Sequence, residues 1–540
     1  MQTECTTESL TFQDVAGRAV VARCDGGTLT SDGGGVWLRE VDRATGLLAR
    51  FAGCFTDHRD AARVTHAVAS LVRQRVYGRA RGYEDLTDHD ALRHDPLMAV
   101  LAESPDLAAP GAGKSTLNRL ELTTATVADT ERYTKITVDH DAIDQLFVQV
   151  FVEAHATPPT TIILDLDATD DPVHGAQEGR FFHGDYGPYG YLPLSIFAGA
   201  HLLGARRRPS NLDASAGALE EVERIVAQRR AVWPAVAITR RADSGFCRDA
   251  LMTWCEAHAV DYVFGLAKNA RLIAMIDDEL ADAAATCAAT HQPARIFAER
   301  TYQTLDRWTC ARRVVAKAEQ RTATTAEGEG KRNPRFVVTS LSLAHSDAHS
   351  DARTLYEDVY CARGDRENRI KEPPLGRFAD RTSAATLRAN QRRLYVSSVA
   401  YVLLAALRRL GLAGTARARA QCTTIRLTLL KIGARIRVTV RKVWLALASG
   451  CPQAALFAQV HANLRRCERD GAEAPPRPRV PTRVGRRRDP VTGARPSTPA
   501  PMAPSRAPGT RNGVTSSPNP SPTHRVKTVF HIHAPTTNPW

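Results

Sequence analysis

The sequence predicts an α/β protein with a mixed β-sheet at its centre. Between residues 139 and 266, short apolar segments alternate with longer segments whose apolar residues recur every three or four positions. The first pattern is typical of buried strands and the second of amphipathic helices. Their alternation along one chain indicates a sheet covered by helices. The chain has 540 residues, which is long enough for roughly two to four domains, and 43% of them are hydrophobic, which is enough to form their cores.

The N-terminal region is predicted to be helical over residues 60–105. Four apolar residues share one helix face there: Val64, Val68, Leu71 and Val72. Asp95-Pro96 is typical of a helix start, and Thr87-x-x-Asp90 resembles a capping box. Five arginines lie around and beyond that face: Arg63, Arg73, Arg75, Arg79 and Arg81. They indicate either contacts to DNA phosphates or a solvated helix face.

The central elements follow in a regular order. From the N-terminal side they are a helix over 139–155 that ends before Pro158, a strand Ile162–Asp167, strands Tyr191–Phe197 and His201–Ala205, a helix that turns Leu219, Val222, Ile225 and Val226 inward, a strand over 235–241, a helix over 246–258 and a strand Tyr262–Leu266. Strands that alternate with helices in this way predict a mixed sheet.

Residues 268–350 interrupt that rhythm. They contain Arg-rich, strand-like pieces, Arg307–Ala316 and Arg335–Ser340, around a polar stretch. We interpret them as an insertion between the sheet and the helices expected over 353–372 and 386–411. From about residue 470 the sequence is Pro, Arg, Ser and Thr with few aliphatic residues. Such a segment buries too little apolar surface to offset its chain entropy, so we expect disorder.

The charge balance indicates a polyanionic partner. Lys and Arg number 72 against 58 Asp and Glu, a net charge of +14. Nucleic acid is the leading candidate and an anionic membrane surface the second. The 11 cysteines contain no Cys-x-x-Cys pair, which predicts reduced thiols. Neither the first residues nor the apolar run Val399–Leu407 predicts a signal peptide or a membrane span, so we expect a cytoplasmic protein.

The segment PGAGKST at residues 110–116 invites comparison with a nucleotide-binding loop. The full pattern requires glycine five residues before Gly113, where this chain has Ala108. The preceding residues also predict a helix, whereas a phosphate loop follows a strand. A turn that leads into a helix over Ser115–Leu122 therefore explains the segment better than nucleotide hydrolysis does.

Two aspartates stand where predicted strands end. Asp167 closes an apolar strand, and Asp243 closes a second strand before Ser244. Two such strands side by side would hold their carboxylates at one sheet edge, and Mg²⁺ prefers carboxylate oxygen together with water and phosphate. Two ions about 3.5–4 Å apart would serve a phosphoryl transfer. Each aspartate alone is also typical of a turn or a helix cap.

A glutamate flanked by cations follows the insertion. On a helix, Arg363, Glu367 and Lys371 are successive neighbours four residues apart and share one face. One interpretation is a solvated ladder of ion pairs. The other is a metal-binding glutamate whose flanking cations hold the phosphates of a nucleic acid.

These motifs together resemble a known family. Tyr360-x-x-Arg363-x-x-x-Glu367 resembles the Tyr/Arg/Glu signature of insertion-sequence DDE (Asp-Asp-Glu) transposases. The segments LDLDATDDPVHG, RRADSGFC and YCARGDRENRIKE resemble, in the same order, the insertion-sequence thirteen-eighty branch of these transposases. The resemblance extends over residues 15–460.

The resemblance implies an RNase H-like catalytic core with a β-rich insertion. On that basis the expected regions are an N-terminal DNA-binding region (1–130), the first part of the core (131–267), the insertion (268–350), the second part of the core with C-terminal helices (351–467) and a disordered basic tail (468–540). It also implies a bacterial protein, associated with the nucleoid when active, that acts as a homodimer on DNA ends.

The implied activity is metal-dependent cleavage at terminal inverted repeats followed by strand transfer into target DNA. The resemblance assigns Asp167, Asp243 and Glu367 as catalytic residues that bind two Mg²⁺ ions, with Mn²⁺ able to substitute. It assigns contacts with DNA phosphate to Tyr360, Arg363 and Lys371. A decayed element that only binds DNA is the alternative from another class, and a nuclease on the same fold is a third.

Three positions stay open at this stage. Asp165, two residues before Asp167 on the same strand face, is the alternative first ligand. The family signature has a lysine seven residues after its glutamate, where this chain has Pro374, so Lys371 would have to substitute one turn earlier. Trp308, in the insertion, is either a base-stacking residue or a core residue.

Overall fold

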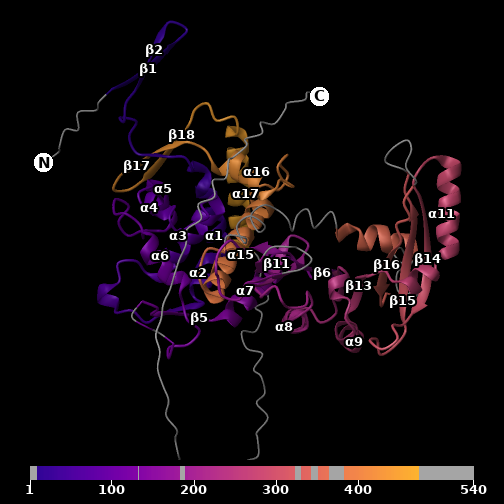
Figure 1. The fold of residues 1–540 in the computed structure, drawn as a ribbon. Coiled ribbons are helices and arrows are strands. Elements are labelled where there is room, and N and C mark those ends of the chain that lie inside the picture. Colours follow the sequence, from indigo (N-terminus) through magenta and orange to yellow (C-terminus); the bar gives the residue numbers. More distant parts are fainter. Residues whose placement is uncertain are drawn as a thin grey trace, which may run out of the picture. The chain divides into compact units, whose positions relative to one another are not determined.

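The computed structural model describes residues 9–473, apart from 130, 132, 183–188, 323–329, 342–350 and 364–381. The chain divides into two units, residues 1–484 and 485–540, and every described residue belongs to the first (Figure 1). Most of the tail for which the sequence predicts disorder, residues 474–540, lies outside the described residues, whereas residues 468–473 are helical and end α17 (Ala454–Glu473).

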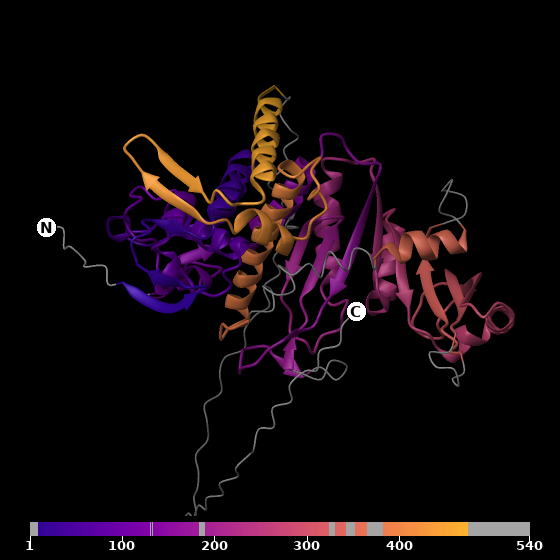
Figure 2. The same cartoon turned by 90° about the horizontal axis from the view of Figure 1, so that it is seen from above.

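An eight-stranded mixed sheet forms the centre of the first unit. Its strand order is β11-β10-β6-β12-β13-β16-β15-β14, and Figure 2 shows strands of this sheet side by side. The strands are β6 (Thr161–Ala168), β10 (Leu194–Ala198), β11 (His201–Arg206), β12 (Ala237–Ala242), β13 (Asp261–Leu266), β14 (Ala294–Tyr302), β15 (Arg312–Gln320) and β16 (Arg335–Thr339). β12 and β13 run parallel to β6, and the other neighbouring pairs are antiparallel. The predicted mixed α/β architecture is confirmed.

The alternation of side chains along β6 explains why this strand lies at the centre. Ile162, Leu164 and Leu166 point to one face and are buried, whereas Asp165 and Asp167 lie on the other. The first face packs in a common core with residues of three helices, α7 (His140–Glu153), α8 (Ala218–Arg230) and α9 (Asp249–Ala257). Burial of each large aliphatic side chain in this core contributes about 2 kcal/mol.

The second face of the sheet carries a smaller core. Val263, Val315 and Val337 contact Leu355 and Tyr356 there. The last two belong to a short helical segment formed by α12 (Ala352–Thr354) and the π-helix η4 (Leu355–Tyr360). This segment leads directly to Arg363, so its packing on the sheet determines where that side chain lies.

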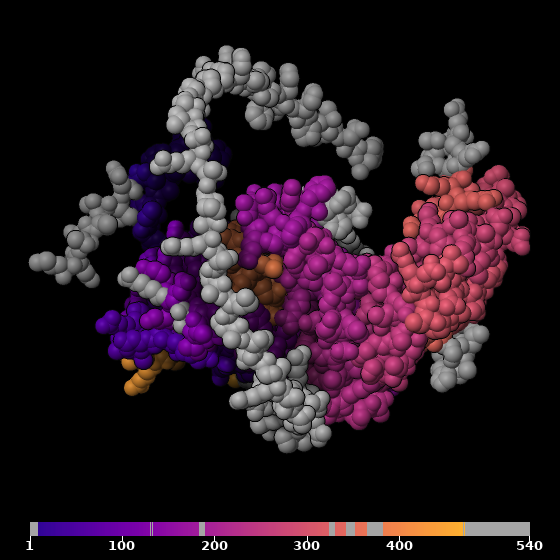
Figure 3. Space-filling model, turned by 60° about the horizontal axis from the view of Figure 1, so that its bottom comes forward, coloured from indigo at the N-terminus to yellow at the C-terminus, as the bar shows by residue number. Residues whose placement is uncertain are grey.

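The insertion is part of the same sheet, through β16. Arg307–Ala316 and Arg335–Ser340 were predicted to be strand-like, and β15 and β16 overlap them. β14 and the helices α10 (Ala270–Ala274) and α11 (Asp277–Thr290) were not predicted. In α11 only three residues are buried, so its apolar periodicity is weak. Trp308 is 7% exposed and packs edge-on against Tyr302, which favours the core interpretation. Figure 3 shows the pink-to-salmon surface of this region adjoining the magenta surface of the earlier strands.

Helices from the two ends of the described chain share a second core (Figure 1). From the N-terminal side these are α1 (Val36–Thr45), α2 (Leu47–Ala52), α3 (Val68–Arg81), α5 (Pro96–Leu101) and α6 (Lys114–Glu121), and the short helix α4 (His89–Leu92) precedes α5. Four of them, α1, α2, α3 and α6, contact α15 (Leu387–Leu410), which was predicted over 386–411 and is buried along most of its length. α15 also contacts β11, so it joins this core to the sheet. None of the described helices is long and apolar enough to cross a membrane.

Short elements complete the described chain. They are β1 (Leu10–Val15), β2 (Arg18–Ala22), β3 (Leu29–Thr30), η1 (Gly33–Gly35), β4 (Phe55–Asp57), η2 (Ala61–Arg63), β5 (Ile136–Val138), β7 (Asp171–Pro172), β8 (Phe181–Phe182), β9 (Tyr189–Tyr191), η3 (Ser244–Phe246), α16 (Cys422–Ile425), η5 (Arg426–Leu430), β17 (Ala434–Val438), β18 (Val443–Leu447) and α17 (Ala454–Glu473). The predicted strand Tyr191–Phe197 is therefore two strands, β9 and β10, which belong to different sheets. All ten cysteines in the described part of the chain are free thiols.

Two predictions about the N-terminal helices have opposite outcomes. Asp95 caps α5 as expected, because its side chain accepts a hydrogen bond from the amide of Leu97. The capping box at Thr87-x-x-Asp90 is wrong: Asp88 occupies the N-cap position without a side-chain hydrogen bond to the helix, and Asp90 instead pairs with Lys114.

Three of the five arginines around this helix, all on α3, contradict both interpretations offered for them. Arg75, Arg79 and Arg81 are at most 1% exposed, so they neither face solvent nor lie open to DNA. Arg75 pairs with Glu121, and Arg81 pairs with Asp32. The spacing of polar residues showed that these side chains share a region of the helix, but it did not show that α15 and α6 pack on that region.

Candidate active site

Asp167 and Asp243 lie at the same edge of the central sheet. β6 and β12 are parallel neighbours whose register runs from the pair Thr161 and Ala237 to the pair Asp165 and Arg241. Each aspartate comes two residues after its strand's member of that last pair. Because the carboxyl ends of parallel strands meet at one edge, the two carboxylates lie close together, as the sequence predicted.

Local hydrogen bonds orient each carboxylate. The hydroxyl of Thr169 donates to Oδ2 of Asp167. Oδ1 of Asp243 caps η3 by accepting a hydrogen bond of 2.8 Å from the amide of Gly245. Oδ1 of Asp167 and Oδ2 of Asp243 take no part in these local bonds. The Asp243 side chain is 41% exposed and that of Asp167 is 13% exposed, so the pair lies at the surface.

A single guanidinium contacts both free oxygens. Nη2 of Arg363 lies 3.1 Å from Oδ1 of Asp167 and 3.5 Å from Oδ2 of Asp243. One cationic group thus reaches both carboxylates at once, which means that they converge on a common point. The sequence placed Arg363 near the site but assigned it to DNA phosphate; its contact with the aspartates was not foreseen.

Asp165 forms a buried ion pair with Arg241. Its oxygens receive two hydrogen bonds from Arg241, of 2.6 Å from Nε and 2.9 Å from Nη2. Both side chains are 1% exposed. A carboxylate that is buried and paired in this way is poorly placed to bind a metal ion together with Asp243, so Asp167 is the stronger candidate for the first ligand.

Arg241 also holds the segment that carries Arg363. Its Nη1 donates a hydrogen bond to the carbonyl oxygen of Val359 in η4. One side chain therefore joins β12, β6 and η4, four residues before Arg363. The sequence contained a signal that was overlooked, since Arg240 and Arg241 occupy consecutive positions in a strand that is buried over five of its six residues. Two arginines there require buried partners.

Tyr360 lies beside the same edge of the sheet. A side chain at Gly265 would bring its Cβ to 2.5 Å from the hydroxyl of Tyr360, so only glycine allows this approach. Tyr360 also lines a pocket of about 230 Å³ together with Ser244, Lys268 and Arg335. Two cations and two phenols therefore border a hollow beside Ser244, the residue after Asp243, and this lining would favour a phosphate group.

Three positions named from the sequence lie outside the described residues: Glu367, Lys371 and Pro374. The helix predicted over 353–372 is described only to Arg363, as α12, η4 and the short turn after them. Within the described part of the chain, no group of three or more His, Cys, Asp or Glu side chains is placed to hold a metal ion. The described site thus consists of two carboxylates, one bridging arginine and the neighbouring pocket.

Comparisons with known proteins identify the family to which the chain belongs. A family model described as "Transposase DDE domain group 1" matches residues 12–469. No curated protein sequence matches the chain. Among solved structures, the cryo-EM structure of the piggyBac transposase synaptic complex with hairpin DNA is similar, with 11% sequence identity, a TM-score of 0.36 and 83% of each chain covered.

Proposed function

Because this chain belongs to group 1 of the DDE transposase domains, it is a DNA transposase, and we propose that Asp167 and Asp243 are the first two carboxylates of its catalytic centre. The observation that carries this assignment is the convergence of both side chains on one guanidinium group. The third carboxylate of the proposed centre is Glu367, four residues after Arg363 in the sequence.

The strand order supports an RNase H-like core. β11, β10 and β6 form an antiparallel meander, and β12 and β13 follow in parallel on the other side of β6. In this proposal residues 131–267 form the first part of the core, 268–350 an insertion that extends the sheet, and 351–467 the second part with the C-terminal helices. Residues 1–130 form a DNA-binding region.

DDE transposases use divalent metal ions, and the residues present fit such ions. Carboxylate oxygens are the ligands that Mg²⁺ prefers, and Arg363 shows that a positive group is accommodated between them. We propose two Mg²⁺ ions, with Mn²⁺ able to replace them. Two bound ions would supply activation of the attacking oxygen and stabilisation of the leaving oxygen.

The remaining residues would position DNA. A guanidinium binds phosphate through two parallel hydrogen bonds, so Arg363 is suited to exchange its carboxylate partners for a DNA phosphate when cations occupy the aspartates. Tyr360 and Lys371 would contribute further phosphate contacts, and Lys371 would serve where the family signature has a lysine at the position of Pro374.

The proposed reaction has two steps at the ends of a mobile element. A water molecule attacks a phosphodiester at the terminal inverted repeat and frees a 3′-hydroxyl, which then attacks a phosphodiester of the target DNA. Both steps are in-line displacements at phosphorus, so positioning and charge stabilisation supply most of the catalysis. We propose that the protein acts as a homodimer on DNA ends, belongs to the insertion-sequence thirteen-eighty branch, and works in the bacterial cytoplasm at the nucleoid.

Cleavage of a labelled element end in the presence of Mg²⁺ tests the assignment. Asp167→Asn and Asp243→Asn should each lower the cleavage rate by at least about 1,000-fold, because they remove the ligand charge and keep the side-chain size. Asp261→Asn is the matched control, since Asp261 begins a neighbouring strand at the opposite sheet edge. Asp261→Asn should cleave at the wild-type rate.

Cleavage by Asp167→Asn or Asp243→Asn at the wild-type rate would refute the site. Wild-type protein that binds inverted repeats without metal-dependent cutting would instead identify a decayed element. Cutting without joining to a target plasmid would identify a nuclease.

A further inference from the structure

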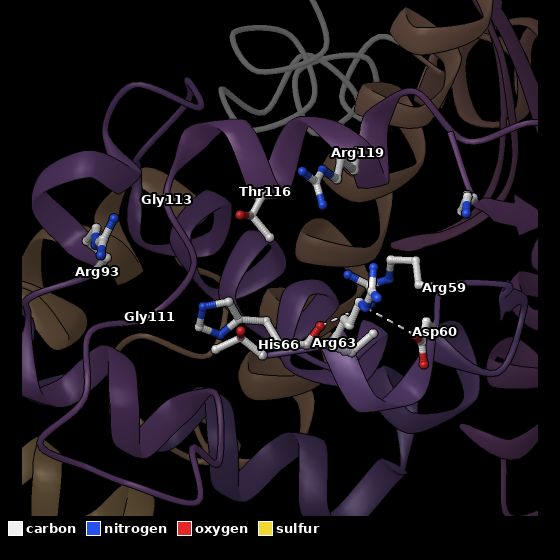
Figure 4. A pocket seen from close by; sticks show the side chains of 12 residues that line it. Arg59, Asp60, Arg63, His66, Arg93, Gly111, Gly113, Thr116 and Arg119 are labelled. Atoms are coloured by element: carbon white, nitrogen blue, oxygen red, sulfur yellow. Dashed lines mark hydrogen bonds and ion pairs between the residues drawn. The ribbon is translucent and has the colours of Figure 1, made fainter. Parts of the chain in front are cut away.

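A basic pocket of about 420 Å³ lies among the N-terminal helices, apart from the elements that carry the two aspartates (Figure 4). Four stretches of chain line it: residues 59–66 after β4, Arg93 between α4 and α5, the loop and first turns of α6, and Lys135 before β5. In Figure 4, Thr116 and Arg119 project from α6 toward the centre, while Arg59, Arg63 and His66 lie across from them.

Positive charge dominates the lining of the pocket. Its cationic residues are Arg59, Arg63, Arg93, Arg119 and Lys135, and its one carboxylate is Asp60. Two of the arginines are already paired, Arg59 with Asp57 and Arg63 with Asp60. Among the described residues, the other three cations form no ion pair with a carboxylate. Like charges gathered in this way create a positive potential that favours a bound anion.

The side chains of Arg93 and His66 are both affected by this positive environment. The Nε of Arg93 is buried and has no hydrogen-bond partner in the described structure. Burial, then Arg93, then Arg59 lower the pKa of His66, so the imidazole adds no further charge near neutral pH. An anion in the pocket would compensate the unpaired guanidinium.

The PGAGKST loop supplies a rigid wall. The amide of buried Gln74 clamps the backbone of Ala112 with two hydrogen bonds, of 2.7 Å to its oxygen and 2.9 Å from its nitrogen. The loop also bonds to Arg93, whose carbonyl oxygen accepts from the amide of Gly111. At Gly113 a Cβ would lie 3.0 Å from Nη1 of Arg93, so glycine lets this arginine approach the loop.

The pocket lacks the parts that a nucleotide-hydrolysing loop needs. Lys114, the lysine of the PGAGKST segment, pairs with Asp90 at 2.9 Å and does not line the pocket. A helix, α5, precedes the loop, as the sequence predicted, where a phosphate loop follows a strand. Among the described residues of the lining, His66 is the only aromatic one, so little is available on which a base could stack. The chemistry favours phosphate over a nucleoside.

We propose that this pocket binds the phosphodiester backbone of DNA, as a contact separate from the carboxylate edge of the sheet. The choice of DNA as the polyanion rests on the proposed function. Arg93, Arg119 and Lys135 would provide the contacts, in place of the buried arginines of α3 that the sequence had offered. Each contact is to phosphate, so binding here is independent of base sequence.

Binding of a short fluorescent duplex of arbitrary sequence tests this inference with the full chain in EDTA, which removes metal-dependent contacts. Arg93→Gln and Arg119→Gln should each weaken binding about 3- to 10-fold. Because each variant removes one cation that neutralises a phosphate, the slope of log K against log salt should also fall by about 0.9. Arg43→Gln is the matched control, because Arg43 is an exposed arginine of α1 whose side chain pairs with Glu40. It should keep the wild-type slope.

The outcomes separate this inference from the proposed function. Wild-type affinity and slope in the Arg93→Gln/Arg119→Gln double variant would overturn the inference, while loss of cleavage in Asp243→Asn would still support the active site. Thermal unfolding of each variant distinguishes weaker phosphate binding from a folding defect. If Arg119→Gln unfolds at the wild-type temperature, its DNA affinity decides whether the inference holds. If ATP or inorganic phosphate binds the wild type and fails to bind the variants while their DNA binding persists, the pocket is a site for small phosphates and the inference is wrong.

Discussion

The arginines of the N-terminal helices, together with burial, change the pKa of His89. Its Nδ1 lies 3.2 Å from the amide nitrogen of Gln74, which also clamps the PGAGKST loop. Burial, followed by the charges of Arg75, Arg81 and Arg79, lowers the pKa of His89 to about 2. The imidazole therefore stays neutral in the folded protein and accepts the hydrogen bond from Gln74.

This histidine should make the folded state sensitive to acid. An unfolded histidine binds a proton below about pH 6.5, whereas folded His89 does so only near pH 2. Between these values the unfolded state holds more protons, so the free energy of unfolding should fall by about 1.4 kcal/mol for each pH unit of acidification. His89→Gln should reduce the pH dependence of the free energy of unfolding by this amount, measured as the change in the urea midpoint between pH 7 and pH 5. Exposed His94, changed to Gln, is the control; an unaltered slope in His89→Gln would contradict the prediction.

At the scale of elements, the buried side chain of Arg241 adds a polar contact to the apolar packing that holds the π-helix η4 on the sheet. Arg241 pairs with Asp165 on β6 and bonds to the carbonyl of Val359 in η4. A buried ion pair gives little net stability, because desolvation offsets the attraction. Its effect here is positional: it fixes the segment that delivers Arg363 to Asp167 and Asp243.

Separate changes in stability and activity should reveal that role. Arg241→Gln alone leaves the Asp165 carboxylate buried without its partner and should cost about 3–5 kcal/mol. The double variant Asp165→Asn/Arg241→Gln replaces both charges and should recover most of that stability. Its cleavage rate should nevertheless stay well below that of the wild type, at unchanged DNA affinity, because η4 is no longer held. A double variant with full cleavage activity would show that the pair is only structural.

Local patterns in the sequence predicted the elements well and their partners poorly. The apolar runs that end at Asp167 and Asp243 are local, so both strand ends and their approach to one edge could be predicted. The pairing of Arg241 with Asp165, and of Arg75 with Glu121, joins residues far apart in the chain. Periodicity shows which residues share a face but not what packs against it. Arg363 was correctly placed near the site, but its contact with two carboxylates depends on how η4 lies on the sheet.

At the scale of the whole first unit, a buried ion network joins three helices of the second core, α3, α6 and α15. Glu121 at the end of α6 accepts hydrogen bonds from Arg75 of α3, at 3.1 Å, and from Arg393 of α15, at 2.6 Å. The three side chains are at most 7% exposed. Because α15 also contacts β11, this network joins the N-terminal helices, and the basic pocket among them, to the sheet that carries the aspartates.

Loss of the shared carboxylate should therefore destabilise the unit as a whole. Glu121→Gln keeps the shape but leaves two buried arginines without a counter-charge, so the free energy of unfolding should fall by about 3–5 kcal/mol. Glu40→Gln is the matched control, because Glu40 is partly exposed and pairs only with surface arginines; it should change stability by about 1 kcal/mol or less. Urea unfolding followed by tryptophan fluorescence and by circular dichroism should give coincident transitions in both variants, since α15 belongs to the second core and contacts β11 of the sheet. A Glu121→Gln protein in which the N-terminal helices unfold separately, before the sheet, would show that the network does not couple the two.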